Sequence, residues 1–333
     1  MNNCIKVDND TLAWLEGPMS QTLLPVLYIT TMCISVPTSI VALLVVAFQT
    51  RKYQPSTILM INLAIVDLLF LATLPLSISY HFTQNNWKYP RALCHITVTA
   101  RFLNVHCSTF FLTSISLDRF ATIVFPVRTL SWRNCFYSSI VTATGWVLMI
   151  LATVPFNTAQ LVLCVHGREK FFYTCFDVFR IADGRFLLNY SIFLITILFF
   201  LPFTIMMVCY VSILHSVLRL NTWAKLRRHQ KAAAKFSIMM LIALTFVLVP
   251  CNVVLLAHLI HLKVHKYSPL YGYYNLCVAI SSINTCIDTF VFYFVSPPFR
   301  TKVNRLLFCC PSIPSNDNPQ RRNEDSSRGT QNN

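Results

Sequence analysis

Charged residues and glycines are scarce in this sequence. Of its 333 residues, 12% are charged and six are glycine, whereas 55% are hydrophobic. Soluble domains carry about 25% charged residues, so this composition excludes an ordinary water-soluble protein. The shortage of glycine also argues against glycine-rich loops that cradle phosphate groups. The sequence is therefore interpreted as that of a membrane protein.

The motifs of common catalytic sites are missing as well. The sequence contains no H-E-x-x-H, no G-x-S-x-G and no Walker loop, and its nine histidines do not follow a metal-ligand spacing. The seventh apolar stretch has no lysine for a retinal Schiff base, and no internal repeat of the transporter kind is obvious. No catalytic residue is predicted, and an enzyme or a channel is the least favoured functional class.

Basic residues outnumber acidic ones, 27 to 12, which gives a formal charge of +15. They do not form one patch suited to nucleic acid, because they punctuate the apolar stretches. This spacing predicts contact with anionic membrane lipids. Most Lys and Arg residues fall on the inner side if the N-terminus is outside. The chain is therefore predicted to be a multi-pass plasma-membrane protein with an extracellular N-terminus.

Seven apolar stretches are long enough to cross a membrane as helices. Short connections between them predict antiparallel neighbours in one bundle. The expected fold class is all-α, a seven-transmembrane helix bundle at 20–296. It follows a polar, extracellular segment at 1–19, which lacks the order of a cleavable signal and holds a glycosylation sequon at Asn9. The approximate limits of the stretches are 20–48, 56–82, 92–125, 135–159, 186–218, 232–262 and 271–296.

The sequence after the seventh stretch divides into two parts. Basic and apolar residues alternate at helical spacing over 297–310, which predicts a short amphipathic helix on the inner membrane surface. Cys309 and Cys310 at its end are candidate palmitoylation sites. The polar remainder, 311–333, is expected to be a disordered cytoplasmic tail.

The triplet Asp118-Arg119-Phe120 lies at the inner end of the third stretch. Charged residues next to an apolar run at membrane depth are costly, so this pair is expected to have a function. In the third of seven spans it indicates a membrane switch that reports to the cytosol. The alternative is an arginine that only anchors the helix at the interface.

Two acidic residues, Asp67 and Asp288, lie deep within the second and seventh stretches. Buried acids need partners or ions. Asn104 and Ser108, one turn apart in the third stretch, and Asn284, one turn before Asp288, are candidate partners. Their carboxylate, amide and hydroxyl oxygens suit a small hard cation, which predicts a sodium site. A dry hydrogen-bond network between the helices is the alternative.

Arg101 lies about two turns into the third stretch from the outside, where an isolated cation is costly. It could pair with Asp177 or Asp183 of the outer loop, or it could bind an anionic ligand group through bidentate contacts. Acids are fewer than bases on the outer rim, which favours the anionic ligand. Aromatic residues there could wall a subsite or could serve as membrane anchors. The predicted ligand-binding residues besides Arg101 are Phe102, Tyr80, His81, Arg185, His258 and Tyr274.

Most of the 13 cysteines lie in or near apolar stretches and are expected to be packing residues. Cys94 begins the third stretch on the outer side, and Cys175 lies in the longest outer loop. A disulfide between them would tie that loop over the mouth of the bundle, although sequence alone does not prove the pairing. Cys4 and Cys164 are also outside, and could pair or remain free thiols.

These features together resemble the rhodopsin-like (class A) G-protein-coupled receptors over roughly residues 20–310. The strings T-L-S-W-R at 129–133 and T-C-F-D-V at 174–178 are similar to the branch of purinergic, lysophospholipid and proteinase-activated receptors. The short N-terminus leaves little room for a long cleavable leader, which argues against activation by a protease. The resemblance to the class rests on N-L-A-I-V-D at 62–67, D-R-F at 118–120, Cys94 with Cys175, Trp146, Pro202, Tyr210, Pro250 and Asp288.

This resemblance implies roles for the residues at matching positions. Arg119 would hold the inactive state and then contact a heterotrimeric G protein, and Asp118 and Tyr210 would belong to the same coupling region. Arg101 would lie at the depth where such receptors meet their ligands. The residues that match the sodium site are Asp67, Asn104, Ser108, Asn284 and Asp288.

The sequence departs from the family pattern at four places. Thr38-Ser39 replaces a Gly-Asn pair in the first span, and the seventh reads D-T-F-V-F at 288–292, without the usual proline and tyrosine. Leu248 replaces a bulky aromatic residue in the sixth span. The basic run at 227–231 lacks the acid that would hold Arg119. These departures predict either a less restrained inactive state or a weak or decoy receptor.

The sequence therefore predicts a receptor that binds an extracellular anionic ligand, a nucleotide or a lysophospholipid-like molecule, and activates heterotrimeric G proteins. The alternative is a non-signalling receptor that scavenges ligand or modulates partner receptors. Membrane lipids are expected partners, nucleic acid is not, and no cofactor is expected other than a sodium ion.

Overall fold

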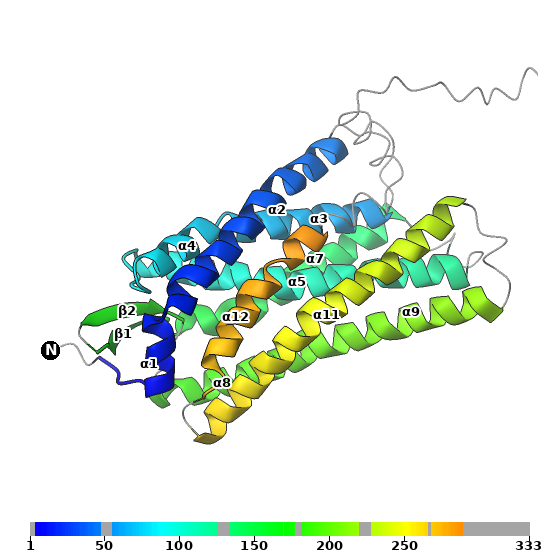
Figure 1. Cartoon of the computed structure of the whole chain (residues 1–333). Helices are drawn as coiled ribbons and strands as arrows, with labels where there is room; N and C mark the ends of the chain where they lie inside the picture. Colours follow the sequence, from blue (N-terminus) through cyan, green and yellow to red (C-terminus); the bar gives the residue numbers. More distant parts are fainter. Residues whose placement is uncertain are drawn as a thin grey trace, which may run out of the picture.

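The computed structural model shows a bundle of long helices with a small β-hairpin at one end (Figure 1). The predicted all-α, seven-helix class is confirmed. The structure describes residues 4–47, 55–125, 129, 134–168, 170–176, 181–219, 228–265 and 268–288. The predicted amphipathic helix at 297–310, the tail at 311–333, Cys309 and Cys310 lie outside them. In chain order the helices of the bundle are α2 (Leu24–Ala47), α3 (Pro55–Leu71), α4 (Leu74–Phe82), α5 (Arg91–Val124), α7 (Cys135–Thr158), α8 (Ile181–Ile195), α9 (Leu201–Arg219), α11 (Arg228–His265) and α12 (Tyr271–Ser281).

The first six predicted membrane spans agree with these helices to within a few residues. The third span, α5, is one continuous helix but is more polar than the others, because it carries Arg101, Asp118 and Arg119. The seventh span begins with α12 and is described as far as Asp288. Within the described residues, five helical segments are long and apolar enough to cross a membrane: Met19–Leu44, Pro55–Phe82, Cys135–Thr158, Arg185–Ser216 and Thr245–His265.

Several spans are irregular close to a proline. The second span breaks between α3 and α4, next to Pro75. The fifth contains a π turn, η2 (Thr196–Phe200), directly before α9 and Pro202. Because proline has no N–H, Pro202 leaves the carbonyl four residues earlier, that of Leu198, without its usual helical partner. Another π turn, η1 (Met19–Leu23), precedes α2 in the same way.

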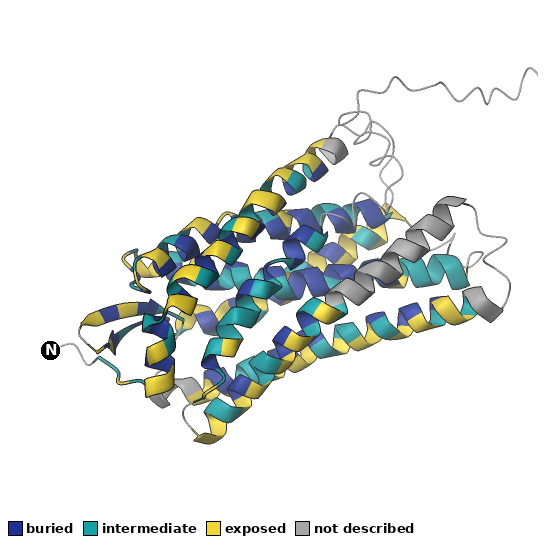
Figure 2. Ribbon diagram, viewed as in Figure 1, coloured by how far each residue is buried: buried dark blue, intermediate teal, exposed yellow. Residues whose placement is uncertain are grey.

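Helix α5 runs through the middle of the bundle and packs against α3, α7 and α9. Its Phe111 is fully buried, together with Leu63 of α3 and Met149 of α7. Gly145 allows α7 to come close, since a Cβ atom at this position would lie 2.5 Å from the ring of Phe110. Buried residues face the interior and exposed ones face outward (Figure 2), where many apolar side chains are available to lipid.

A β-hairpin covers the outer end of the bundle. Its strands, β1 (Val162–His166) and β2 (Phe171–Cys175), are antiparallel. The disulfide Cys94–Cys175 joins the end of β2 to the start of α5, with 5.9 Å between the two Cα atoms. This is the pairing that the sequence suggested, and it holds the hairpin against the bundle.

The N-terminal segment is tied to the same hairpin. Cys4 forms a disulfide with Cys164 of β1, a pairing that the sequence left open. Ile5 pairs with Val165, in parallel, beside the hairpin. The chain then forms a short helix, α1 (Asn9–Glu16), at the outer surface (Figure 1).

Helix α1 is fixed by its cap and by one apolar face. The Asp8 carboxylate accepts a hydrogen bond from the backbone N–H of Thr11 at 2.9 Å, as an N-cap residue does. Leu12 and Leu15 pack in one buried cluster with Val165 of the hairpin and Tyr271 of α12.

Polar contacts hold the last turn of α1. Glu16 forms an ion pair with Arg168 at 3.7 Å, and Asn85 donates a hydrogen bond to the carbonyl of Leu15 at 2.6 Å. Asn9 is exposed at the start of the helix, and its glycosylation stays a prediction.

The Cys4→Ser variant should loosen the N-terminal segment. Removing a native disulfide from a small domain costs roughly 2 kcal/mol or more, so amide hydrogen exchange in residues 4–16 should accelerate about tenfold or more. The matched control is Cys33→Ser, which changes an exposed free thiol of α2. Exchange in residues 4–16 that is equally slow in both variants would show that the disulfide does not hold the segment.

Candidate functional site

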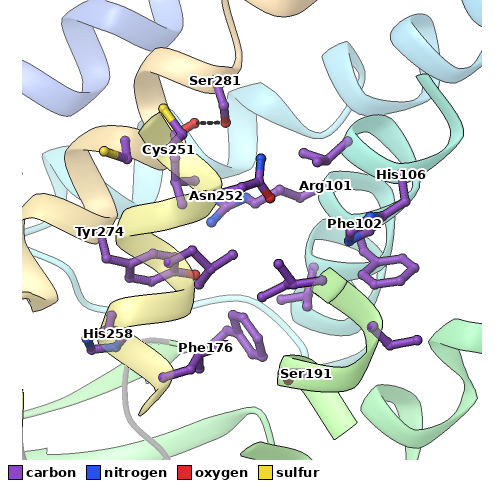
Figure 3. A pocket seen from close by; sticks show the side chains of 18 of the residues that line it. Arg101, Phe102, His106, Phe176, Ser191, Cys251, Asn252, His258, Tyr274 and Ser281 are labelled. Atoms are coloured by element: carbon purple, nitrogen blue, oxygen red, sulfur yellow. Dashed lines mark hydrogen bonds between the residues drawn. The ribbon is translucent and has the colours of Figure 1, made fainter. Parts of the chain in front are cut away.

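A cavity lies between the outer halves of five helices, and Phe176 beyond β2 closes one side of it. Figure 3 shows its walls, which come from α5, α7, α8, α11 and α12. Most of them are apolar. The apolar lining residues include Val98, Phe102, Val105, Phe156, Leu194, Ile195, Leu255, Leu259 and Val278.

Arg101 extends from α5 into this mainly apolar space (Figure 3). A guanidinium interacts more strongly with an anion in such surroundings than in water, since the local dielectric is low. Its planar fork of donors also suits a carboxylate or a phosphate. The alternative partners, Asp177 and the side chain of Asp183, lie outside the described part of the chain.

Four of the predicted ligand-binding residues come together at the cavity: Arg101, Phe102, His258 and Tyr274. The rings of His258 and Tyr274 stack in parallel with their centroids 5.1 Å apart, which joins α11 to α12. His258 is held from its other side by a 2.9 Å hydrogen bond between its Nδ1 atom and the hydroxyl of Ser268. These contacts fix one wall of the cavity.

The other three predicted residues do not line the cavity. His81 is buried beside α2, where its Nδ1 atom is 2.7 Å from the side-chain oxygen of Asn85 and its ring stacks on Tyr28. Tyr80 is buried against Trp87, below the hairpin. Both residues lie on α4, beyond the break near Pro75.

Arg185 is the third predicted residue outside the cavity. It is exposed near the outer end of α8. Arginine is tolerated at that depth because its charged head can reach water beyond the membrane. The position of Arg185 therefore requires no ligand.

Several polar residues that the sequence prediction missed also line the cavity, among them His106, Ser191, Asn252 and Ser281. His106 lies one turn below Phe102 on α5, and their ring centroids are 4.3 Å apart. Asn252 lies on α11 just after Pro250. Helical spacing from Phe102 could have identified His106, because residues four positions apart share a face.

The predicted sodium-site residues form one buried cluster in the centre of the bundle. Asn104 donates a hydrogen bond to Oδ1 of Asp67 at 3.0 Å, and Asn284 donates one to Oδ2 of Asp288 at 2.8 Å. Ser108 lies beside Asp288. All five side chains are 0–2% exposed.

Four of the five side chains keep an oxygen atom without a hydrogen-bond partner in the described residues. These atoms are Oδ2 of Asp67, Oγ of Ser108, Oδ1 of Asn284 and Oδ1 of Asp288. Buried oxygens of this kind are costly unless a cation or a donor reaches them. The set of hard oxygen ligands therefore fits a sodium ion, and the hydrogen bonds present do not satisfy the cluster alone.

The predicted G-protein-coupling residues lie near the inner end of α5. Arg119 donates a long hydrogen bond, 3.4 Å, to the hydroxyl of Ser56 on α3. Within one turn of Arg119, the hydroxyls of Ser116 and Tyr210 are hydrogen-bonded at 3.0 Å and link α5 to α9. Asp118 contributes its carbonyl to a hydrogen bond from Thr122. The side chains of the basic run at 227–231 lie outside the described residues.

Hydroxyl residues one and two turns before Ser39 form a polar contact between α2 and the seventh span. The hydroxyls of Ser35 and Thr285 are 2.9 Å apart, and those of Thr31 and Ser282 are 3.2 Å apart. Ser39 is also buried, at 1% exposure. Small hydroxyl residues let two membrane helices approach closely and hydrogen-bond. The hydroxyls of Thr31 and Ser35 stabilise this helix pair, whereas Thr38 donates to carbonyls of its own helix.

Comparison with known proteins assigns the chain to a family. Residues 38–292 match the family described as 7 transmembrane receptor (rhodopsin family). This range covers well over half of the chain, so the chain belongs to that family. The class is therefore that of the rhodopsin-like G-protein-coupled receptors.

Particular members of the family are similar to most of the chain. The human S-geranylgeranyl-glutathione receptor is 32% identical over 91% of this chain and 84% of its own length. The chicken purinoceptor 8 is 29% identical over 97% of this chain and 90% of its own length. Human proteinase-activated receptor 1 is 31% identical over 91% of this chain and 71% of its own length.

These findings confirm the resemblance to the purinergic and proteinase-activated branch. The protein is a receptor and not an enzyme. It is a multi-pass protein of the plasma membrane, and in this family the N-terminus is extracellular.

Proposed function

We propose that this receptor binds an extracellular amphiphile, which combines an anionic group with an apolar chain, and that it passes the signal to heterotrimeric G proteins. The observation that carries the proposal is Arg101 in a cavity of mainly apolar walls. Among the described residues that line this cavity, Arg101 is the only lysine or arginine. A nucleotide with several phosphates would need more cations, which favours a ligand with one acidic region.

One of the relatives supports the same chemistry. One of them is named for S-geranylgeranyl-glutathione, a molecule that joins an apolar isoprenyl chain to an acidic tripeptide. In this receptor, Arg101 would bind the acidic group of the ligand, and the apolar residues around Phe102 and Leu255 would bury its apolar chain. Burial of apolar surface contributes about 25 cal/mol per Å². The apolar chain of the ligand would therefore supply most of the affinity, and Arg101 would fix the orientation of the ligand.

The Arg101→Ala variant tests the anionic contact. Activation of G proteins should be measured in cells with S-geranylgeranyl-glutathione, oleoyl lysophosphatidic acid and ADP as probes. The variant should lose ten- to hundredfold in potency toward an active amphiphile, since a charge-assisted hydrogen bond contributes roughly 1.5–3 kcal/mol. Arg185→Ala, which changes an exposed arginine outside the cavity, should respond as the wild type does. Stronger activation by ADP than by either amphiphile would contradict the proposal.

The inner end of α5 would carry the signal to the G protein. Arg119 bridges from α5 to Ser56 of α3 through a long hydrogen bond, and a small movement of α3 against α5 would break this contact. The guanidinium would then turn toward a partner at the cytosolic face.

The Arg119→Ala variant should abolish stimulated nucleotide exchange on the G protein and retain binding of the active amphiphile at the cell surface. Arg91→Ala, at the exposed outer end of the same helix, is the matched control and should signal normally. Equal silence of the wild type and Arg119→Ala, with binding intact, would favour the non-signalling receptor instead.

We also propose that the buried cluster around Asp67 and Asp288 binds a sodium ion. Sodium at several times its Kd would stabilise the folded receptor by about 1 kcal/mol, or about 2–4 °C in Tm. Replacing NaCl by choline chloride at equal ionic strength should lower Tm of the wild type by that amount. The Asp67→Asn variant should show no such difference, whereas Asp10→Asn, on the exposed face of α1, should behave as the wild type. A wild-type Tm that is equal in the two salts would support the dry network.

A further inference from the structure

The hydrogens of the two serine hydroxyls in the cavity point away from it, toward backbone carbonyls. Ser191 donates to the carbonyl of Leu187 at 2.8 Å, and Ser281 donates to that of Val278, also at 2.8 Å (dashed in Figure 3). Hydroxyl groups in helices often bond in this way to the preceding turn. Because a hydroxyl has one hydrogen, each of these oxygens offers only lone pairs to a ligand.

The side-chain amide of Asn252 also donates to a backbone carbonyl and turns its acceptor toward the cavity. Its Nδ2 atom donates to the carbonyl of Leu248 at 2.9 Å, and the residue is 4% exposed. A carbonyl can only accept, so the nitrogen must be the atom that faces it. The oxygen is therefore on the other side of the amide, directed toward the cavity (Figure 3).

His106, on the opposite wall of the cavity, also donates to the backbone and keeps an acceptor without a partner. Its imidazole hydrogen-bonds the backbone of Leu198, the residue whose carbonyl Pro202 leaves without its helical partner. Its Nδ1 atom is buried and has no hydrogen-bond partner in the described part of the chain. A neutral imidazole that donates through one nitrogen can only accept at the other.

We propose that this cavity selects ligands that bring hydrogen-bond donors of their own. The inference rests on the proposed function and narrows it: the amphiphile is an acid that also carries an amide N–H or a hydroxyl. Three neutral groups, from α8, α11 and α12, present lone pairs to the cavity, and the buried Nδ1 atom of His106 on α5 is a further unpaired acceptor in its wall. Arg101 supplies the donors for the acid. Asn252 is the specificity-determining residue, because its oxygen has a fixed direction. A ligand without a donor would bury these acceptors unsatisfied, which is unfavourable.

Two probes that differ in one N-methyl group test the inference. N-oleoylglycine has a carboxylate, an apolar chain and an amide N–H, and N-oleoylsarcosine is the same molecule with that nitrogen methylated. Binding to the purified full-length receptor should be measured by thermal stabilisation over a concentration series. The wild type should bind N-oleoylglycine about tenfold more tightly than N-oleoylsarcosine, and Asn252→Leu should reduce this preference to less than twofold.

A matched control is available on α7. Asn157 also donates to a carbonyl of the preceding turn, at 3.3 Å from Thr153, but it is exposed and outside the cavity. Asn157→Leu should keep the wild-type preference. Should Asn252→Leu fail to fold, Ser281→Ala removes another acceptor without added bulk and should weaken the preference.

The outcomes separate the two proposals. Equal binding of both probes to the wild type would overturn the inference and leave the acid-binding amphiphile receptor in place. A preference that persists in Asn252→Leu and in Ser281→Ala would mean that the methyl group is excluded by size, which also overturns it. If neither probe stabilises the wild type while oleoyl lysophosphatidic acid does, the amide class is wrong; if no amphiphile does, the proposed function fails as well.

Discussion

At the depth of a lipid bilayer a polar group has no water to bind, so each hydrogen-bonding group needs a partner within the protein. The hydroxyl groups of Thr109, Thr113 and Ser116 on α5 all donate to carbonyls four residues earlier. The same constraint acts on the polar residues of the cavity. It directs the hydrogens of Ser191, Ser281 and the Asn252 amide toward carbonyls of their own helices. The hydrogen-bonding character of the cavity therefore depends on backbone bonding, and not only on which residues line it.

Helix α5 connects the three polar regions of the receptor. Its inward face carries Arg101 at the cavity, Asn104 at the buried acids, and Ser116 and Arg119 near the cytosolic end. These positions recur at helical spacing, and the helix spans about 27 Å between the two arginines at 1.5 Å per residue. A continuous helix is stiff, so a displacement at one end is transmitted along it. Such a displacement would change the contacts that α5 makes with α3, α9 and the seventh span.

The helices and the buried cluster could be predicted from the sequence, since both follow from local patterns. Apolar runs define membrane helices, and the spacing of Asn104 and Ser108, or of Asn284 and Asp288, holds along any regular helix. The direction of Tyr80 and His81 could not be predicted in this way. They lie beyond the break near Pro75, where the helical register of the second span is interrupted, so a single period no longer tells which side faces the cavity.

Other features depend on contacts between distant parts of the chain. The cap at Asp8 signals the start of a helix, but the residues that α1 packs against are on the hairpin and on α12. Asn252 has no distinguishing context in the sequence, and only the position of its amide beside the Leu248 carbonyl gives it an orientation. Arg101 could be singled out from the sequence because a cation at membrane depth is informative by itself, and it does line the cavity; its contact with a ligand stays a prediction.

The tie between Cys4 and Cys164 imposes an order on biosynthesis. The two cysteines are 160 residues apart in sequence, and four membrane spans separate them. During synthesis the amino end must reach the lumen of the endoplasmic reticulum first and remain there with a reduced thiol. Its partner arrives only after the fourth span has been inserted. This disulfide can therefore form only after the first four spans have been inserted with the correct orientation.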